Sequence, residues 1–354
     1  MTLRVIQWAT GGVGQAAIGQ ILLHPELELV GCWVHSEAKA GKDVGEILGT
    51  DPIGVIATSS IDEILAMDAD CVLYSPLMPN PKEVAALLKS GKNVVTPLGW
   101  FWPSEEDRTR MEPHAIAGGV TLHGTGIDPG GATEQQPLFF AGLSSAITYV
   151  RGEEYSDLRT YNAPDVVRHI MGFGGTPEEA MTGPMLALLT NGFTQSVQMC
   201  LDTLGFADAD IRATREVAVA TAPIDSPIGV IAPGQVAAQQ FAWEAYVGDT
   251  KVVRVAVNWL MGDEHLDPPW EFGPEGKRFE VEVKGDPDCL VMIHGWHPTT
   301  VAAGLVRNPG IVVTAAHCVN SIPYVCAADP GIVTFVDLPL VTGRAHPDLA
   351  RPAG

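Results

Sequence analysis

A glycine-rich turn near the beginning of the chain limits its possible folds more than any other feature. Residues 3–8 form a short apolar run, residues 9–14 form the turn, and residues 15–23 have helical spacing. A second apolar run follows at residues 28–34. Strand, turn, helix and strand in this order are typical of the βαβ unit that binds dinucleotides. The sequence therefore predicts a parallel sheet with a dinucleotide at its edge.

The turn supplies what a dinucleotide needs from the backbone. Gly11 lets the main chain approach a pyrophosphate, Gly14 lets the helix pack on the strand, and the helix N-terminus offers free N–H groups. Ala9 stands where the usual Gly-x-Gly-x-x-Gly pattern has its first glycine, so an ordinary glycine-rich connection is the alternative. The predicted cofactor contacts are Thr10, Gly11, Gly12, Val13 and Gly14.

The residues after the second strand bear on which nucleotide binds. An NAD enzyme usually places an acid there, whereas an NADP enzyme supplies donors and positive charge for the 2′-phosphate. His35, Ser36 and Lys39 suit a 2′-phosphate. Glu37 would favour NAD if it pointed at the ribose. We predict NADP as the cofactor; the alternatives are NAD, and a Lys39 that is only a solvated side chain.

Strands and helices continue to alternate after this unit. Strands are predicted over residues 54–57, 71–75, 93–96 and 120–123, and helices over 60–67, 81–90, 104–117 and 134–143. Such alternation builds a doubly wound parallel sheet, whose ligands bind beyond the carboxyl ends of the strands. Further cofactor contacts are predicted at Ser75, Pro76, Leu77, Thr96, Pro97 and Leu98. The aromatic run that follows, Trp100 and Phe101, is either core packing or an apolar wall for a substrate.

Composition excludes several classes of partner. The chain has 354 residues, which suits two domains, and 46% of them are hydrophobic. Its formal charge of −21 argues against nucleic acid and anionic membranes. No run of about 18 apolar residues and no targeting segment is present, so a cytoplasmic location is expected. The six cysteines are scattered without a Cys-x-x-Cys pair and the histidines lack ligand spacing, so no metal is predicted.

The pattern changes after residue 144. Apolar runs rich in β-branched residues cover residues 147–151, 211–221, 236–247, 251–261, 278–284 and 289–294, with helices at 164–171 and 184–204. They predict an α+β domain on a largely antiparallel sheet. Helical spacing returns at 299–307 and 311–321. We predict a first domain of residues 1–143 plus about 308–354, and a second of residues 144–307.

Four segments together resemble the dihydrodipicolinate reductase-like family. They are residues 5–14 (VIQWATGGVG), 154–165 (EYSDLRTYNAPD), 171–174 (MGFG) and 320–323 (NSIP). The likeness spans nearly the whole chain and is greatest to the branch of 2,4-diaminopentanoate dehydrogenases and related NAD(P)-dependent amine dehydrogenases. It implies an N-terminal Rossmann domain, an inserted domain with substrate and homodimer contacts, and hydride transfer between nicotinamide and a C=N or C=O carbon.

Two departures limit what the resemblance implies. Dihydrodipicolinate reductases carry two histidines and a lysine where this chain has Tyr155, Asp157 and Arg159, which argues against lysine biosynthesis. The amine dehydrogenases are expected to hold a catalytic glutamate in the loop after residues 94–96, and that loop here lacks one. Making an amine needs a group that moves protons near neutral pH. The remaining polar candidates include Glu154, and our prediction for proton transfer is Tyr155 or Asp157, with His169 behind them.

A small and mostly apolar substrate is predicted, with no nucleic acid or membrane partner. The predicted pocket residues are Trp100, Phe101, Tyr161, Asn162, Arg168, Met171, Phe173 and His317, and Asn320 is a further cofactor contact. The main prediction is an NADP-dependent oxidoreductase, either amine dehydrogenase-like or a ketone or imine reductase. The alternatives are a homoserine or semialdehyde dehydrogenase on the same scaffold and a non-catalytic NADPH sensor. A semialdehyde dehydrogenase needs an activated cysteine, and no cysteine has a polar setting.

Overall fold

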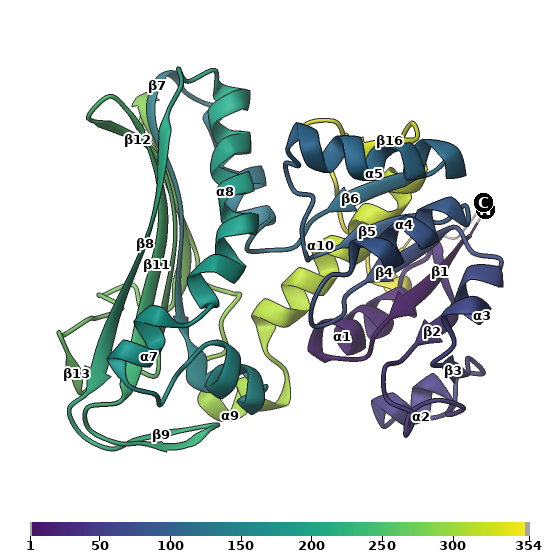
Figure 1. Ribbon diagram of the computed structural model, residues 1–354, viewed down its shortest axis with the longest axis horizontal. Coiled ribbons are helices and arrows are strands. Elements are labelled where there is room, and N and C mark those ends of the chain that lie inside the picture. Colours follow the sequence, from purple (N-terminus) through teal and green to yellow (C-terminus); the bar gives the residue numbers. More distant parts are fainter. Residues whose placement is uncertain (1, 351–354) are drawn as a thin grey trace. The chain divides into compact units, whose positions relative to one another are not determined.

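The computed structural model describes residues 2–350, which divide into two compact units (Figure 1). Unit 1 comprises the residues up to Ile127 and those from Ile311 onward, and unit 2 is Asp128–Gly310. The sequence placed the first boundary at 143. The difference arises because residues 131–141 pack on unit 2: a Cβ at Gly152 would lie 2.7 Å from the Ala132 carbonyl oxygen, and Cys200 Sγ donates to the Thr133 carbonyl at 3.8 Å.

Unit 1 is a doubly wound sheet of seven parallel strands, as predicted. The strands in spatial order are β16 (Gly331–Val333), β6 (Thr121–Gly124), β5 (Asn93–Thr96), β4 (Cys71–Tyr74), β1 (Leu3–Trp8), β2 (Leu27–Trp33) and β3 (Ala57–Thr58). The last strand, β16, pairs with β6, so the C-terminal segment returns to the first sheet and extends it at one edge.

Helices cover both faces of this sheet, because its strands are apolar on both sides. One core joins the sheet to α1 (Gly12–Ile21) and α10 (Pro309–Cys326), and the other joins it to α3 (Ile61–Ala66), α4 (Pro81–Lys89) and α5 (Glu105–Gly118). Ser60, Asn80 and Ser104 accept a hydrogen bond from a backbone N–H in the first turn of α3, α4 and α5, which explains where these helices begin. The short α2 (Val44–Leu48) and η4 (Pro347–Leu349) complete the unit.

Unit 2 is built on a seven-stranded, largely antiparallel sheet, as the sequence predicted. Its order is β13 (Leu266–Asp267), β8 (Asp210–Ala220), β11 (Val236–Val247), β12 (Thr250–Leu260), β7 (Ser145–Asp157), β14 (Arg278–Asp286) and β15 (Cys289–Ile293). The exception to antiparallel pairing is β7, which is parallel to β12. Strand β7 is also longer than the predicted strand at 147–151 and includes several candidate site residues.

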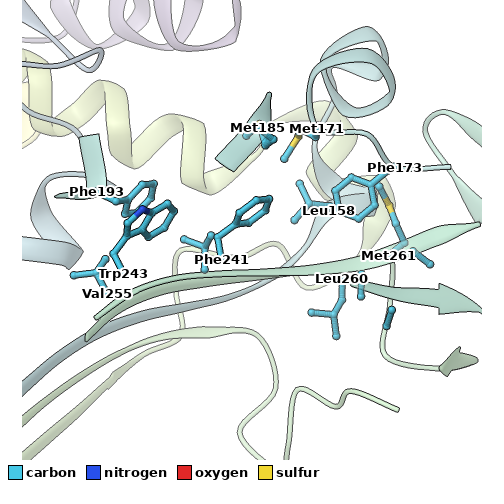
Figure 2. Close-up of a cluster of buried hydrophobic side chains, with 14 of the residues drawn as sticks. Leu158, Met171, Phe173, Met185, Phe193, Phe241, Trp243, Val255, Leu260 and Met261 are labelled. Carbon is cyan, nitrogen blue, oxygen red and sulfur yellow. The ribbon is translucent and has the colours of Figure 1, made fainter. Parts of the chain in front are cut away.

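The core of unit 2 lies between this sheet and the long helix α8 (Met185–Leu204), which runs along one sheet face (Figure 1). Phe193 of α8 stacks on Trp243 of β11 with ring centroids 4.2 Å apart, as Figure 2 shows. The unit also contains a two-stranded sheet of β9 (Ile224–Ser226) and β10 (Gly229–Ile231), and the helical segments η1 (Gly131–Gln135), α6 (Gln136–Ala141), η2 (Leu158–Thr160), η3 (Val166–Ile170), α7 (Pro177–Thr182) and α9 (Val301–Val306). Among residues 2–350, no helix combines the length and apolarity needed to cross a membrane.

Candidate functional site

The turn between β1 and α1 has the geometry that an anion site requires. A Cβ at Gly14 would lie 2.2 Å from the Ala9 carbonyl oxygen, so only glycine allows the helix to begin this close to the strand. A Cβ at Gly11 would have no heavy atom within 4 Å, which leaves the outer side of the turn open. In the described chain no side chain caps α1 and its first turn holds no acid. The first N–H groups of α1 are thus oriented to receive an anion.

Ala9 adopts the conformation that the missing first glycine would favour. Its φ is +75°, in the left-handed region, and its N–H donates to the Trp33 carbonyl at 2.9 Å. A non-glycine residue in this region costs about 1–2 kcal/mol. The turn therefore keeps the conformation of the glycine-rich pattern although its sequence departs from that pattern.

Lys39 lies against this turn. Its Nζ donates to Thr10 Oγ1 at 2.9 Å and to the Thr10 carbonyl at 3.4 Å, while Thr10 itself is 6% exposed. Ser36 and Lys39 belong to one tight turn, in which the Lys39 N–H donates to the Ser36 carbonyl at 2.9 Å. The side chains of His35, Ser36 and Glu37 are exposed. A cation is therefore held beside the open N-terminus of α1.

The other predicted cofactor contacts follow β4 and β5, at the C-terminal ends of the strands, where the turn after β1 also lies. Ser75 Oγ accepts from Gln7 Nε2 at 2.9 Å, and the Leu98 N–H donates to Thr96 Oγ1 at 3.2 Å. The loop after β5 passes close to the end of β6, since a Cβ at Gly124 would lie 2.0 Å from the Gly99 carbonyl oxygen. Gly12, Val13, Pro76, Leu77 and Pro97 lie in the same loops and first turn.

The aromatic run after β5 is buried in unit 1. Trp100 is 7% exposed and belongs to the core under α4 and α5, and Phe101 is 2% exposed. This burial favours core packing over an apolar substrate wall at both positions. The loop also lacks the glutamate that the resemblance led us to expect there.

Two predicted residues of α10 lie in unit 1. His317 Nδ1 and Thr125 Oγ1, just beyond β6, are 2.7 Å apart. Burial, with a smaller contribution from His123, lowers the pKa of His317 to about 4, so its ring is neutral near pH 7. Asn320, one turn further along α10, is partly exposed.

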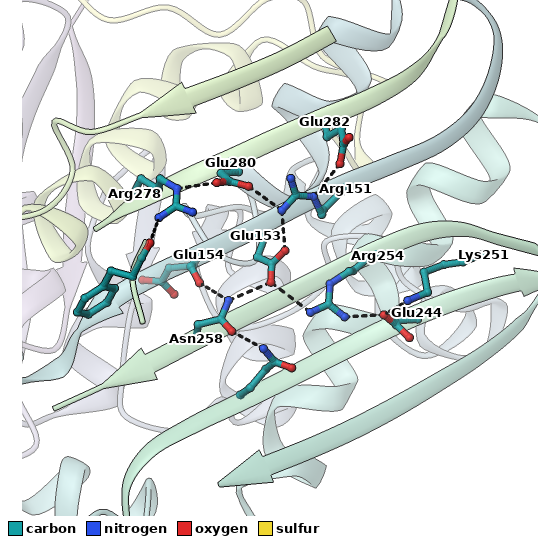
Figure 3. A network of polar contacts seen from close by, with 12 residues as sticks. Arg151, Glu153, Glu154, Glu244, Lys251, Arg254, Asn258, Arg278, Glu280 and Glu282 are labelled. Carbon is teal, nitrogen blue, oxygen red and sulfur yellow. Dashed lines mark hydrogen bonds and ion pairs between the residues drawn. The ribbon is translucent and has the colours of Figure 1, made fainter. Parts of the chain in front are cut away.

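In unit 2, two consecutive glutamates of β7 point to opposite faces of the sheet and meet opposite environments. Glu153 lies among cations, as Figure 3 shows: Arg151 Nη1 is 2.7 Å from it and Arg254 Nη2 is 3.1 Å from it. Burial alone would raise the pKa of Glu153, but Arg254, Asn258 and Arg151 hold it below the ordinary value. Glu154, on the α8 face, accepts from Trp259 Nε1 at 2.9 Å.

The carboxyl groups of Glu154 and Asp128 are hydrogen-bonded to each other. Burial, the charge and hydrogen bond of Glu154, and the charge of Glu134 raise the pKa of Asp128 well above its usual value. Burial also raises the pKa of Glu154, although the hydrogen bonds from Trp259, Asp128 and Ser156 oppose this shift. Their mutual hydrogen bond raises the pKa of Asp128 and lowers that of Glu154, so Asp128 is the donor and Glu154 the acceptor of the shared proton.

A third carboxyl lies behind this pair. Glu134 in η1 is fully buried, and its Oε2 accepts from the Gly130 N–H at 2.8 Å. Burial raises its pKa to about 8, against the hydrogen bonds of Thr133, Gly130 and Ser196. Asp128 Oδ1 and Glu134 Oε1 are buried and have no hydrogen-bond partner among the described residues. Unit 2 thus holds a carboxyl cluster with unfilled hydrogen-bonding capacity.

The three residues predicted for proton transfer have separate contacts. The Tyr155 ring lies under the Arg278 guanidinium, 4.0 Å from it, on the sheet face opposite Glu154. Asp157 is 2.6 Å from Arg159 Nη2 and caps η2, which gives it a structural role. His169 is exposed on η3.

The predicted pocket residues of unit 2 are divided between its core and its surface. Met171 is 4% exposed and Phe173 is 1% exposed, and both pack in the core of Figure 2. Arg168 and Asn162 are exposed and donate to the Ile228 and Leu305 carbonyl oxygens. Tyr161 is partly buried, and burial followed by the charge of Glu154 raises its pKa. Tyr161 is thus a predicted pocket residue whose pKa is raised by burial and by the charge of a member of the carboxyl cluster.

Sequence reasoning did not single out Asp128, and it placed Glu154 only among several polar candidates. Residues 150–157 carry no apolar alternation, so the extension of β7 through both glutamates follows from its pairing with β12 and β14. The pairing with Asp128 is a long-range contact that no local pattern reports.

Metal ligands and cysteine thiols are two further kinds of candidate site residue. Residues 2–350 contain no cluster of three or more His, Cys, Asp or Glu side chains that could hold a metal. Cys32, Cys71, Cys200 and Cys318 are buried, and burial raises the pKa of each thiol, to about 12 for Cys32. These four thiols lack the activation that a semialdehyde dehydrogenase requires.

Comparison with known proteins places the chain in a family. Residues 138–348 match the 2,4-diaminopentanoate dehydrogenase C-terminal domain. The amine dehydrogenase of Streptomyces virginiae is 29% identical over 356 residues, which cover 96% of each chain. The 2,4-diaminopentanoate dehydrogenase of Acetoanaerobium sticklandii is 30% identical over 358 residues, which cover 96% of this chain and 94% of that one.

A solved structure has the same fold. The amine dehydrogenase from Mycobacterium smegmatis superimposes with a TM-score of 0.76 at 22% sequence identity, over 97% of this chain and 98% of that one. These findings confirm the resemblance inferred from the sequence. The chain belongs to the 2,4-diaminopentanoate dehydrogenase family and is an oxidoreductase.

Proposed function

We propose that this protein is an NADP-dependent amine dehydrogenase that acts on a small and mostly apolar substrate. Hydride would pass between nicotinamide and the C=N or C=O carbon of that substrate. The observation that carries this proposal is the turn from Ala9 to Gly14, which leaves the N-terminus of α1 uncapped and open beside a held lysine. Membership of a dehydrogenase family supports the amine chemistry.

The residues present fit a nicotinamide dinucleotide. When bound, that cofactor supplies or accepts the hydride. The N–H groups of Gly12 and Val13 would hold the pyrophosphate, and the absence of a Cβ at Gly11 leaves room for it. Residues that follow β4 and β5, among them Ser75 and Leu98, lie at the C-terminal ends of these strands. The rest of the dinucleotide would extend along these ends.

Lys39 supports NADP over NAD. It is beside Thr10 at the end of β1, and no acid contacts this point within the described residues. Replacing Lys39 by alanine is expected to weaken NADPH binding by about 10-fold or more and to change NADH binding little, because only NADPH carries the 2′-phosphate. Calorimetric titration with each nucleotide measures this.

The matched control for this prediction is Lys42→Ala, which removes the same charge from an exposed lysine three residues away. It should leave both affinities unchanged. Equal losses for NADPH and NADH in Lys39→Ala would contradict the assignment of the 2′-phosphate.

We also propose that the protein acts as a homodimer, as the resemblance implies. In support, the sheet face of unit 2 that carries Glu153 bears a network of charges that neutralise one another (Figure 3). Because these charges are paired within the chain, a second copy can approach this face without strong like-charge repulsion, which is compatible with pairing across a two-fold axis. Light scattering on the purified protein tests the subunit number.

The activity itself is tested with deuterated cofactor. [4-²H]NADPH is supplied with a panel of small ketones, with and without ammonia, and deuterium in the product is measured by mass spectrometry. Deuterated amine formed only when ammonia is present is the expected result. Deuterated alcohol without ammonia would support ketone reduction instead, and NADPH binding without turnover would support the sensor alternative.

A further inference from the structure

We propose that Asp128 and Glu154 bind the nitrogen of the substrate and move its protons, as a hydrogen-bonded carboxyl pair. This inference rests on the proposed function, because it assigns the proton transfers of the amination. It also gives a role to a cluster that no fold requirement explains, since two facing carboxyls do not stabilise a core. The glutamate expected after β5 is missing, and this pair supplies the chemistry from the loop after β6 and from β7.

Asp128 follows the last parallel strand before unit 2 closely along the chain. Asp128 follows Gly124, the last residue of β6, by four positions. Four residues span at most about 14 Å, so Asp128 lies within that distance of the carboxyl end of β6. The carboxyl ends of such strands are where ligands of these sheets bind.

The surroundings of the pair are suited to a cationic nitrogen. The groups that act on it are the carboxyls of Glu134 and of the pair itself, the Trp259 indole, the Ser156 hydroxyl and the Tyr161 ring, which are neutral or anionic. Both Asp128 and Glu154 retain partial exposure, and Asp128 Oδ1 lacks a hydrogen-bond partner among the described residues. An ammonium or amine would supply the missing donor and the missing positive charge.

The proton transfers balance within the pair. The Glu154 carboxylate takes one proton from ammonium, and the ammonia adds to the ketone carbon to give a carbinolamine. The Asp128 carboxyl then gives its proton to the carbinolamine hydroxyl. The C–O bond breaks, water leaves, and the nitrogen lone pair forms the C=N bond of an iminium. The Asp128 carboxylate that remains faces this cation and regains a proton from Glu154.

Asp128→Asn and Glu154→Gln test the proposal, because each keeps the shape of the side chain and removes its acid. We expect each variant to lose about 100-fold or more in kcat for reductive amination, the range typical of a lost general acid or base. Reduction of a preformed cyclic imine, 2-methyl-1-pyrroline, needs neither ammonia nor the loss of water but still places its nitrogen against the pair. We therefore expect its KM to rise while its kcat changes by less than about 5-fold. A purely structural role would lower the kcat of both reactions together.

Tyr155→Phe is the competing variant, because it removes the tyrosine hydroxyl predicted from the sequence on the opposite sheet face. It should retain amination. A readout independent of activity is the infrared band of a protonated carboxyl at pH 7, which we expect in the unmodified protein and expect to weaken in Asp128→Asn.

The outcomes separate the two proposals. If the unmodified protein aminates no ketone, the proposed function fails. If it does and both acid variants retain amination, or Tyr155→Phe loses it as fully as they do, the assignment to Asp128 and Glu154 is wrong while the proposed function stands. A parallel loss of kcat in amination and in cyclic imine reduction would also overturn the assignment.

Discussion

Replacing Gly14 by alanine is expected to destabilise unit 1 by about 3 kcal/mol and to weaken binding of the dinucleotide. The new Cβ would lie 2.2 Å from the Ala9 carbonyl oxygen and 3.1 Å from Gln7 Nε2. The first of these is a backbone atom, so α1 has to move away from β1. Differential scanning calorimetry of the protein without nucleotide should show the loss as a lower Tm, by about 2–4 °C for each kcal/mol.

Two other glycines of the same helix region serve as controls. Gly19→Ala places a methyl group where no heavy atom lies within 4 Å, and alanine favours a helix over glycine, so Tm should stay or rise. Gly11→Ala has equal space and a φ of −74°, so it should keep its Tm while weakening NADPH binding, because the methyl group occupies the open side of the turn. An unchanged Tm in Gly14→Ala would contradict the close approach of strand and helix.

The fold of unit 1 could be predicted because its signals are local. The strand at Leu3–Trp8 and the strand at Asn93–Thr96 have the predicted bounds, since each is a short apolar run that ends at a turn. The helices begin one residue after Ser60 and Ser104, whose hydroxyls cap the first turn. Alanine at position 9 still adopts the left-handed conformation that the first glycine of the pattern would favour.

Unit 2 was less predictable because its decisive contacts are distant in sequence. Strand β7 extends to Asp157 since its second half is paired on both sides, with Asn258 of β12 and Arg278 of β14 opposite Tyr155. These partners lie about a hundred residues away in the sequence, so no local turn pattern predicts the pairing. Polar residues in such a strand look like loop, so the sequence ended it at Arg151.

Part of the candidate site was predicted from the sequence and part was not. Lys39 and Thr10 were expected at the turn and do lie together there. The acid chemistry was sought near Tyr155 and Asp157, yet the Asp157 carboxylate is held by Arg159. A carboxyl becomes a proton donor at neutral pH through burial without a cation, and burial is a property of packing that the residue type alone does not reveal.

Replacing Glu153 by alanine is expected to destabilise unit 2 by about 3–5 kcal/mol, the cost of breaking a buried ion pair by removing one partner. Glu153 has 6% of its side chain exposed and interacts with Arg151, Arg254 and Asn258 (Figure 3). Its loss leaves two guanidinium groups partly unpaired, with side chains that are only 15% and 17% exposed. Thermal unfolding at neutral pH measures the effect.

Glu282→Ala is the matched control, because it removes a glutamate of the same network whose side chain is 25% exposed and whose contact to Arg151 Nε is 3.1 Å. It should cost about 1 kcal/mol or less.

The pH dependence of unfolding tests whether Glu153 stabilises unit 2 through its charge. Because the folded pKa of Glu153 is below its ordinary value, its stabilisation is present at neutral pH and is lost as the pH falls through the folded pKa. The difference between Glu153→Ala and the unmodified protein should therefore shrink on acidification, and a difference that grows would show that Glu153 acts through packing and not through its charge.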